Sequence, residues 1–336
     1  MTAAAAQAVA APAAAAAAAP AAREHRAFGK LILFGEHFVV YHKPALVCAV
    51  KAATVAEVEL SSSEWSTGLL VEDVRPAVPG YKDEKAHEML ESMRLVLGHF
   101  GVDSTKRGVR IVLKGDLAPV SGIGASAANC VSVARALAAA LGRSCSEAEI
   151  NRAGFVGETA YHGTPSGIDN TASTYGGVLR FQRTAGDPLF ETRALGQEIL
   201  IVYASTGITS STTKVVGDVR AKREADPAWY AALEQRYMAV FDAAERAIAA
   251  NEPGLARKLA QLALENHQLC QELTVSCKEL DDMCAVAMAA GALGAKMSGT
   301  GRGGLMFAIC EDVASQDVVA AALAKVSPQV WKTACA

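Results

Sequence analysis

The chain has 336 residues, of which 51% are hydrophobic and 20% are charged. This is the composition of a globular protein long enough to form two domains. The net charge of -3 offers no electrostatic basis for binding DNA or RNA, and no apolar run approaches the roughly 20 residues that span a bilayer. We therefore expect neither a nucleic-acid partner nor a membrane partner.

The N-terminal segment is almost pure alanine, without charge or amphipathic pattern. It predicts a disordered extension over 1–22 that takes no part in the fold, and it lacks the arginines of a transit peptide. The cysteines include no C-x-x-C pair and follow no secretory segment, which indicates reduced thiols and a cytoplasmic location. A loose peroxisomal targeting pattern over 30–38 leaves a peroxisome-like organelle open.

Two short apolar runs, 31–34 and 38–41, flank a Gly-Glu-His turn and predict two strands. Lys30, Glu36 and His37 lie among these apolar neighbours, where an unpaired charge is costly. The three side chains therefore either pair with one another in a hairpin or face a cleft. The sequence leaves both interpretations open.

The next segments alternate between strand and helix patterns. Residues 50–60 predict a strand, and residues 61–80 a polar, proline-containing excursion. Residues 83–100 have apolar side chains at helical spacing, and 108–113 predict a strand that leads into a glycine-rich loop.

That loop, Pro-Val-Ser-Gly-Ile-Gly-Ala-Ser from residue 119, runs into an alanine-rich helix predicted over 125–141. The start of a helix has free backbone N–H groups and a positive dipole end, which attract an anion. Gly122 and Gly124 lack a Cβ, so a phosphate can come close to the backbone. We expect a cradle for a nucleotide phosphate; an ordinary loop before a buried helix is the alternative.

Two other phosphate-binding motifs are excluded. No Gly-Lys-Ser/Thr follows at the spacing of a Walker loop. Gly122, Gly124 and Ala127 fit the dinucleotide pattern G-x-G-x-x-A, but residues 115–119 separate them from the preceding strand. Residues 146–161 predict a helix where that motif needs a second strand, so an NAD site is rejected.

Two carboxylates follow the predicted cradle. Glu158 lies near the end of a helix predicted over 147–161, where the negative helix terminus opposes it and a bound cation would relieve the conflict. The turn sequence 165–170 then presents Asp169. This aspartate is either a turn-capping residue or a functional carboxylate.

A change of composition over 184–196 separates a strand predicted at 178–182 from one at 198–203. We place the domain boundary there, which gives an N-terminal domain over 23–190 and a C-terminal domain over 191–336.

The second half is rich in predicted helices. After a hydroxyl-rich loop the helices are expected at 214–224, 227–249, 253–270, 276–290 and 313–325, the last followed by a short tail. Gly299, Gly301 and Gly304 form another nominal G-x-G-x-x-G, but a strand follows them instead of a helix. They predict either a glycine hairpin or a second loop that faces phosphate.

Three stretches stand together in chain order: Gly29-Lys30 with Gly35-Glu36-His37, the loop of 119–128, and the glycine turn of 296–304. In this order they resemble the three motifs of the GHMP kinases, which are named for galacto-, homoserine, mevalonate and phosphomevalonate kinases. The first stretch and residues 158–170 are most similar to the mevalonate kinases within that family. The resemblance covers about residues 26–310.

The resemblance implies an α+β, two-domain fold. Its N-terminal domain would be of the ribosomal protein S5 domain 2-like type, and its C-terminal domain ferredoxin-like, with ATP in the cleft between them. It also implies ATP and Mg²⁺ as cofactors, mevalonate as the small-molecule substrate, and phosphoryl transfer to its 5-hydroxyl. Whether the protein is a monomer or a homodimer stays open.

Residue by residue, the resemblance assigns Asp169 and Lys30 to catalysis and Ser126 and Glu158 to Mg²⁺. The residues matched to phosphate binding are Pro119, Ser121, Gly122, Ile123, Gly124, Ala125, Ser126 and Ala127. The residues matched to substrate contacts are Glu36, His37, Thr212 and Gly299. Phosphoryl transfer itself needs such groups: hard oxygen ligands for the metal, a carboxylate near the attacking alcohol, and a cation to offset developing charge.

Two positions depart from the family pattern. Ala125 stands where a first serine is usual, which removes one hydroxyl but leaves the backbone N–H groups, so we expect activity to be retained. Arg302 replaces a glycine, which puts in doubt a positive φ at that position.

Other functions fit parts of the same pattern. Phosphomevalonate kinase or another small-alcohol kinase of the same family is the nearest alternative. A catalytically silent ligand-binding paralogue is a third, but such proteins usually lose the lysine, the aspartate or the metal ligand, and all of these are present here.

Overall fold

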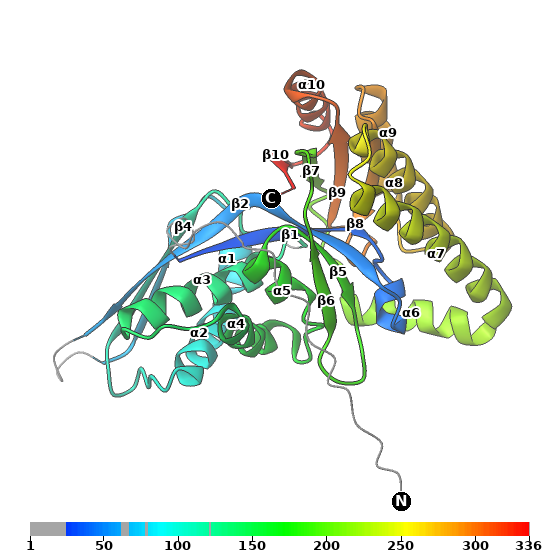
Figure 1. The fold of residues 1–336 in the computed structure, drawn as a ribbon. Helices are drawn as coiled ribbons and strands as arrows, with labels where there is room; N and C mark the ends of the chain where they lie inside the picture. Colours follow the sequence, from blue (N-terminus) through cyan, green and yellow to red (C-terminus); the bar gives the residue numbers. More distant parts are fainter. Residues whose placement is uncertain (1–24, 62–66, 78–79, 121, 336) are drawn as a thin grey trace, which may run out of the picture.

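The computed structural model describes residues 25–61, 67–77, 80–120 and 122–335. The predicted extension over 1–22 and Ser121 lie outside the described residues. The described chain forms two β-sheets, each covered by helices, which is the α+β architecture expected from the sequence (Figure 1).

The first sheet has six strands in the order β3-β4-β2-β5-β6, with β1 also paired to β2. Their bounds are β1 Arg26–Phe34, β2 Ala45–Leu60, β3 Leu69–Asp73, β4 Val109–Gly115, β5 Val178–Gln182 and β6 Leu189–Arg193. The sheet is antiparallel except for the β3–β4 pair. The long strand β2 pairs with β1, β4 and β5, and its first six residues are all buried.

Five helices belong to this half of the molecule: α1 Tyr81–Glu84, α2 Ala86–His99, α3 Ala125–Ala140, α4 Glu147–His162 and α5 Ile168–Tyr175. Helix α3 packs on β1 and β2, and α5 packs on β1, while α2 and α4 form an outer layer against α3 (Figure 1). Helix α3 is buried over most of its length, which its small alanine side chains make possible. Helix α4 starts with a capping box in which Ser146 and Glu149 exchange hydrogen bonds.

The second sheet has four antiparallel strands in the order β10-β7-β9-β8. Their bounds are β7 Leu200–Ser205, β8 Gly294–Ser298, β9 Leu305–Cys310 and β10 Gln329–Ala334. The helices are α6 Thr212–Ala225, α7 Pro227–Ala250, α8 Leu255–Glu272, α9 Lys278–Ala289 and α10 Val313–Leu323. Helices α8 and α9 pack on β8, and α10 packs on β7, β9 and β10.

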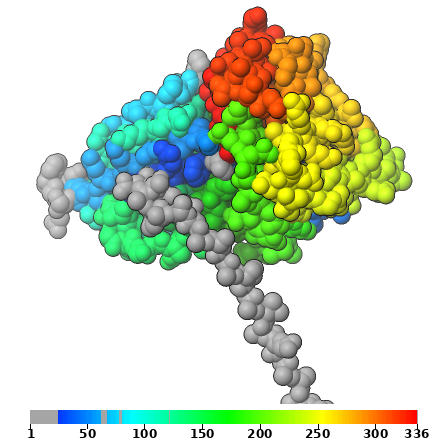
Figure 2. Space-filling model, turned by 45° about the horizontal axis from the view of Figure 1, so that its top comes forward, coloured from blue at the N-terminus to red at the C-terminus, as the bar shows by residue number. Residues whose placement is uncertain are grey.

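The two halves meet through buried contacts. The Ser298 hydroxyl of β8 accepts from the Ile32 N–H at 2.9 Å and donates to the Ile32 carbonyl at 3.1 Å. Phe38 stacks on Tyr237 with ring centroids 4.2 Å apart, and the Tyr237 hydroxyl donates to the Pro44 carbonyl. Figure 2 shows the blue-to-teal half and the yellow-to-red half side by side, with green residues between them. The hydrophobic core is continuous across this junction.

Residues 38–41 differ from the sequence-based prediction, because they form a 3₁₀ helix, Phe38–Tyr41, instead of a strand. The Val39 N–H donates to the Gly35 carbonyl at 2.9 Å, which closes a tight turn before β2 begins. Gly35 has φ +119°, and a Cβ added to it would lie 2.5 Å from the Cβ of Ala45. The tight reversal, not the apolar run, decides the conformation here.

Three further segments also differ. The polar excursion contains strand β3, the turn after 165 continues as helix α5 with Asp169 in its first turn, and the expected C-terminal tail is strand β10. Strand β6 lies within the composition change at 184–196 and pairs with β5. The chain therefore passes from the first sheet to the second between 194 and 199, and the two domain ranges themselves stay a prediction. Among the described residues, no helix is both long and apolar enough to cross a membrane.

Candidate active site

The glycine loop before α3 has the backbone geometry of an anion cradle. Gly122 and Gly124 have φ +95° and +75°, a region that side chains other than glycine rarely adopt. Gly124 is the N-cap of α3, and no side chain caps the free N–H groups. The first turn holds Ser126 and no acidic residue, so nothing on it repels an anion.

Strand β1 is bent toward this loop at Gly29, where its register with β2 shifts. An added Cβ on Gly29 would lie 2.5 Å from the Leu117 side chain and 3.2 Å from the Ile123 carbonyl oxygen. The next residue, Lys30, donates its backbone N–H to the Ile123 carbonyl at 2.7 Å. The bulge thus brings β1 against the cradle and aims the Lys30 side chain into it.

Lys30 joins the two catalytic candidates. Its buried ammonium donates to the Gly122 carbonyl at 2.9 Å and lies 3.3 Å from Oδ1 of Asp169. The Asp169 side chain is 28% exposed, so solvent and small molecules can reach it. The structure therefore brings together the lysine, the glycine loop and the aspartate. In the sequence, Gly122 lies 92 residues after Lys30, and Asp169 lies 139 residues after it.

Glu158 lies beneath the same site at the end of α4. It is 1% exposed, and its Oε1 has no hydrogen-bond partner in the described part of the chain. Burial, with the nearby Asp169 carboxylate, raises the pKa of Glu158 to about 8, while a hydrogen bond from the Ser126 hydroxyl lowers it. An orphaned buried carboxylate oxygen beside a hydroxyl is a donor set that suits Mg²⁺.

The glycine turn between β8 and β9 meets the first motif. His37 Nε2 lies 2.7 Å from the Thr300 carbonyl oxygen, so Nε2 carries the proton and donates. Burial lowers the pKa of His37, which keeps the ring neutral. Thr212, the first residue of α6, lies 2.9 Å from Thr300 between their hydroxyl oxygens. Gly299 has φ +92° and an open space beside its Cα.

Glu36 has a different environment from the other predicted substrate contacts. Its Oε1 pairs with the buried ammonium of Lys296, and its Oε2 accepts from Asn266 Nδ2 at 3.0 Å and from the Gly35 N–H at 3.2 Å. The Glu36 side chain is 1% exposed. Its partners place it in the junction between the two sheets, and its role in substrate binding stays a prediction.

Arg302 adopts the left-handed conformation that the sequence put in doubt, with φ +52°. Its guanidinium pairs with Asp218 of α6, and its Nε donates to the Thr274 carbonyl at 3.1 Å. The side chain therefore ties the third glycine turn to α6.

A pocket adjoins the cradle and shares Pro119, Ala125 and Ser126 with it. The other residues that line it are Asp73, Tyr81, Lys82, Lys85, Met89, Asn129 and Tyr161. The sequence-based reasoning missed this wall because its residues come from separate segments of the chain, which no local pattern brings together. The only local signal was the charged, tyrosine-containing stretch at the start of the following helix.

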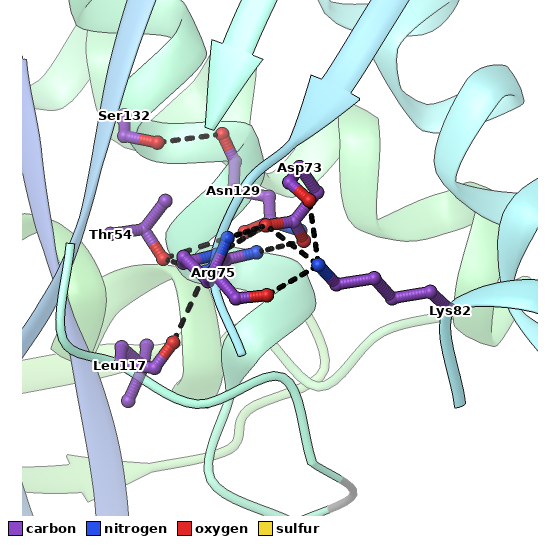
Figure 3. Close-up of polar contacts among 7 residues, drawn as sticks. All are labelled: Thr54, Asp73, Arg75, Lys82, Leu117, Asn129 and Ser132. Atoms are coloured by element: carbon purple, nitrogen blue, oxygen red, sulfur yellow. Dashed lines mark hydrogen bonds and ion pairs between the residues drawn. The ribbon is translucent and has the colours of Figure 1, made fainter. Parts of the chain in front are cut away.

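A buried polar cluster supports this pocket (Figure 3). The Arg75 guanidinium makes two hydrogen bonds to Asp73, from Nε at 2.9 Å and from Nη2 at 2.7 Å, and its Nη1 donates to the Thr54 hydroxyl at 2.5 Å. Lys82 donates to the Asp73 carbonyl at 2.6 Å. Hydrogen bonding and charge from Arg75 lower the pKa of Asp73 although burial opposes this. The cluster fixes one wall of the pocket to β2.

The fold and site can be compared with known proteins. The family models of the GHMP kinases N-terminal domain and C-terminal domain match residues 86–177 and 244–329. A mevalonate kinase of Pyrococcus horikoshii is 33% identical, with 83% of this chain and 86% of that protein covered. The chain belongs to the GHMP kinase family.

Solved structures of GHMP kinases agree with this assignment. The crystal structure of Leishmania major (L. major) mevalonate kinase in complex with R-mevalonate has a TM-score of 0.89 and 38% identity, and covers 93% of this chain and 95% of that one. A Streptococcus pneumoniae phosphomevalonate kinase has a TM-score of 0.67 at 14% identity, covering 91% of this chain and 98% of that one, which is a likeness of fold alone.

Proposed function

We propose that the protein is a mevalonate kinase. It would transfer the γ-phosphoryl group of ATP to the 5-hydroxyl of (R)-mevalonate and so form 5-phosphomevalonate for isoprenoid and sterol biosynthesis. The observation that carries this proposal is the meeting of Lys30, Asp169 and the 122–124 loop, in a chain 38% identical to a protein solved with R-mevalonate.

The phosphates of ATP would lie at the start of α3. The free N–H groups of that helix and the positive-φ glycines leave room for them, and Ala125 supplies a backbone N–H although it lacks a hydroxyl. The nucleotide base would lie in the adjoining pocket, whose lining includes Tyr81, Met89 and Pro119. Aromatic and apolar side chains of this kind suit a flat ring.

The Ser126 hydroxyl and the Glu158 carboxylate would hold Mg²⁺. A hydrogen bond from this hydroxyl lowers the pKa of Glu158, and Glu158 Oε1 lacks a hydrogen-bond partner in the described chain. A magnesium ion held there would neutralise charge on the phosphate oxygens.

Asp169 and Lys30 would act on the acceptor alcohol. Asp169 is within reach of solvent and would accept or orient the proton of the attacking hydroxyl. Lys30, anchored by the Gly122 carbonyl, would offset negative charge that develops between the hydroxyl and the γ-phosphate. Thr212, His37 and Gly299 would border the substrate from the third glycine turn.

A coupled ATP-consumption assay with mevalonate, phosphomevalonate and homoserine side by side tests the proposal. We expect turnover with mevalonate and at most a small fraction of it with the other two. Preference for phosphomevalonate would move the chain to the nearest alternative within the family, and no turnover with any alcohol would indicate a silent paralogue. A cytoplasmic location and a monomeric or homodimeric state remain part of the proposal and rest on the sequence.

A further inference from the structure

Three metal-binding side chains meet where α4 ends and α5 begins. Glu158, His162 and Asp169 each offer one ligand atom, and these atoms lie within 4.8 Å of one another. Glu158 and His162 are one helical turn apart on α4, with Oε2 and Nε2 separated by 3.6 Å. Of these side chains, the family resemblance assigns only Glu158 to a metal.

The cluster contains a buried polar atom without a hydrogen-bond partner in the described chain. Glu158 is 1% exposed, and its Oε1 lacks a hydrogen-bond partner among the described residues. A buried carboxylate without a hydrogen-bond partner is stabilised by a divalent cation that coordinates it, because burying an unpaired charge is costly. The orphaned oxygen is therefore an observation, independent of the clustering, that points to a cation.

The spacing also suits direct coordination. Ligand atoms about 2.1 Å from a metal lie about 3.0–3.4 Å apart when they are adjacent in octahedral or tetrahedral geometry. The 3.6 Å between Glu158 and His162 needs only a small adjustment to reach this range. His162 is half exposed, so its ring can make that adjustment.

The nitrogen ligand decides which cation fits. Mg²⁺ prefers oxygen ligands and retains several waters, whereas imidazole favours Mn²⁺, Co²⁺ and Zn²⁺ in that rising order. A site of two carboxylates and one histidine thus discriminates against Mg²⁺ when no phosphate oxygens are present to compensate.

We propose that His162 is a metal ligand and that, with Glu158 and Asp169, it binds one transition-metal dication such as Mn²⁺ in the nucleotide-free protein. The inference deepens the proposed function, since it assigns a further ligand and a metal preference to the cation site beside the phosphate cradle. Lys30, 3.3 Å from Asp169, opposes the cation and keeps this binding weaker than it would be with three free ligands.

The test is a titration of the full-length, nucleotide-free protein with Mn²⁺, followed by the electron paramagnetic resonance signal of the free ion. We expect one Mn²⁺ per chain, and at least tenfold weaker binding for His162→Gln, while Mg²⁺ affinity measured by competition changes less than threefold. His99→Gln, which changes an exposed histidine on α2, should bind as the wild type does. Binding of Co²⁺ should give a visible absorption band that His162→Gln shifts.

Equal Mn²⁺ binding by wild type and His162→Gln, or no binding without nucleotide, would overturn the inference. Glu158→Gln should abolish binding, and its circular dichroism and urea denaturation check that the protein remains folded. The outcome is separable from the kinase proposal. If the wild type phosphorylates mevalonate but His162→Gln binds Mn²⁺ as the wild type does, only the metal inference is wrong. If the wild type binds Mn²⁺ as expected but phosphorylates none of the alcohols, only the kinase proposal is wrong.

Discussion

Lys30 is the residue through which the candidate site is assembled. Its backbone N–H donates to the Ile123 carbonyl, and its ammonium donates to the Gly122 carbonyl. Its aliphatic stem lies beside Gly124. An added Cβ on Gly124 would lie 3.1 Å from Lys30 Cγ, so the glycine is needed for close packing as well as for its φ. One side chain thereby ties the phosphate cradle to Asp169.

Replacing Asp169 by asparagine keeps the size of the side chain but removes the group that accepts a proton. We expect kcat to fall about 10²–10⁴-fold with a modest change in KM for mevalonate, as for a group that acts mainly in the transition state. Steady-state kinetics check this, with Asp317→Asn on the exposed face of α10 as a control of unchanged activity. Near-normal turnover of Asp169→Asn would remove it from the catalytic role.

Arg302→Gly tests whether the departure from the family pattern matters. The change removes the pair with Asp218, which is partly exposed, and relieves the strain of φ +52°. These effects oppose one another, and in the described part of the chain the Arg302 side chain pairs with Asp218 and Thr274, not with the 122–124 loop. We expect nucleotide affinity, measured by calorimetry with a non-hydrolysable ATP analogue, to change less than tenfold. A complete loss of turnover would contradict this.

Single elements show what local pattern can and cannot predict. Helix α3 and the glycines before it can be predicted from the sequence, because the alanine content and the glycine positions that specify them lie within about twenty consecutive residues. The turn at 38–41 and strand β10 depend on partners far along the chain: β10 is a strand because it pairs with β7. The Arg75 cluster was missed for the same reason, since Thr54 and Leu117 reach it from other elements.

The bulge in β1 gives a prediction for this element. Gly29→Ala places a Cβ 2.5 Å from Leu117 and 3.2 Å from the Ile123 carbonyl, so the strand must move away from the cradle. We expect a loss of about 1–3 kcal/mol in unfolding free energy together with lowered kcat, because Lys30 is displaced. Gly217→Ala in α6 meets no atom within 4 Å and should instead stabilise by about 0.5–1 kcal/mol. Urea denaturation compares the two, and equal effects would argue against the bulge.

At the scale of the whole molecule, the buried pair of Glu36 and Lys296 joins the two sheets. Lys296→Met leaves the Glu36 carboxylate without its cation, and we expect about 3–5 kcal/mol of destabilisation. The double variant Glu36→Gln with Lys296→Met should recover part of this loss, since the amide oxygen still accepts from Asn266. Chemical denaturation measures both. A double variant as unstable as the sum of the two single variants would show that the pair has no specific coupling.

The buried histidines set the pH dependence of stability for the whole fold. Burial lowers the pKa values of His37 and His267 from 6.5, so below that pH the unfolded chain binds protons that the native protein does not. Stability should therefore fall as the pH drops below about 6.5, by up to roughly 1.4 kcal/mol per pH unit for each histidine. Glu158 acts in the opposite sense: its raised pKa of about 8 favours the protonated native state, and that contribution is lost as the pH rises toward 8.

Together these groups predict a maximum of stability near pH 6.5 in metal-free, nucleotide-free protein. Urea midpoints measured in chelating buffer from pH 5 to pH 8.5 test this. His37→Gln should flatten the acid side, because the glutamine amide can take the place of Nε2 as a donor to the Thr300 carbonyl but takes up no proton. Glu158→Gln should flatten the alkaline side. A midpoint that rises steadily to pH 8.5 in the wild type would contradict the assignment for Glu158, and an unchanged acid side in His37→Gln would contradict that for His37.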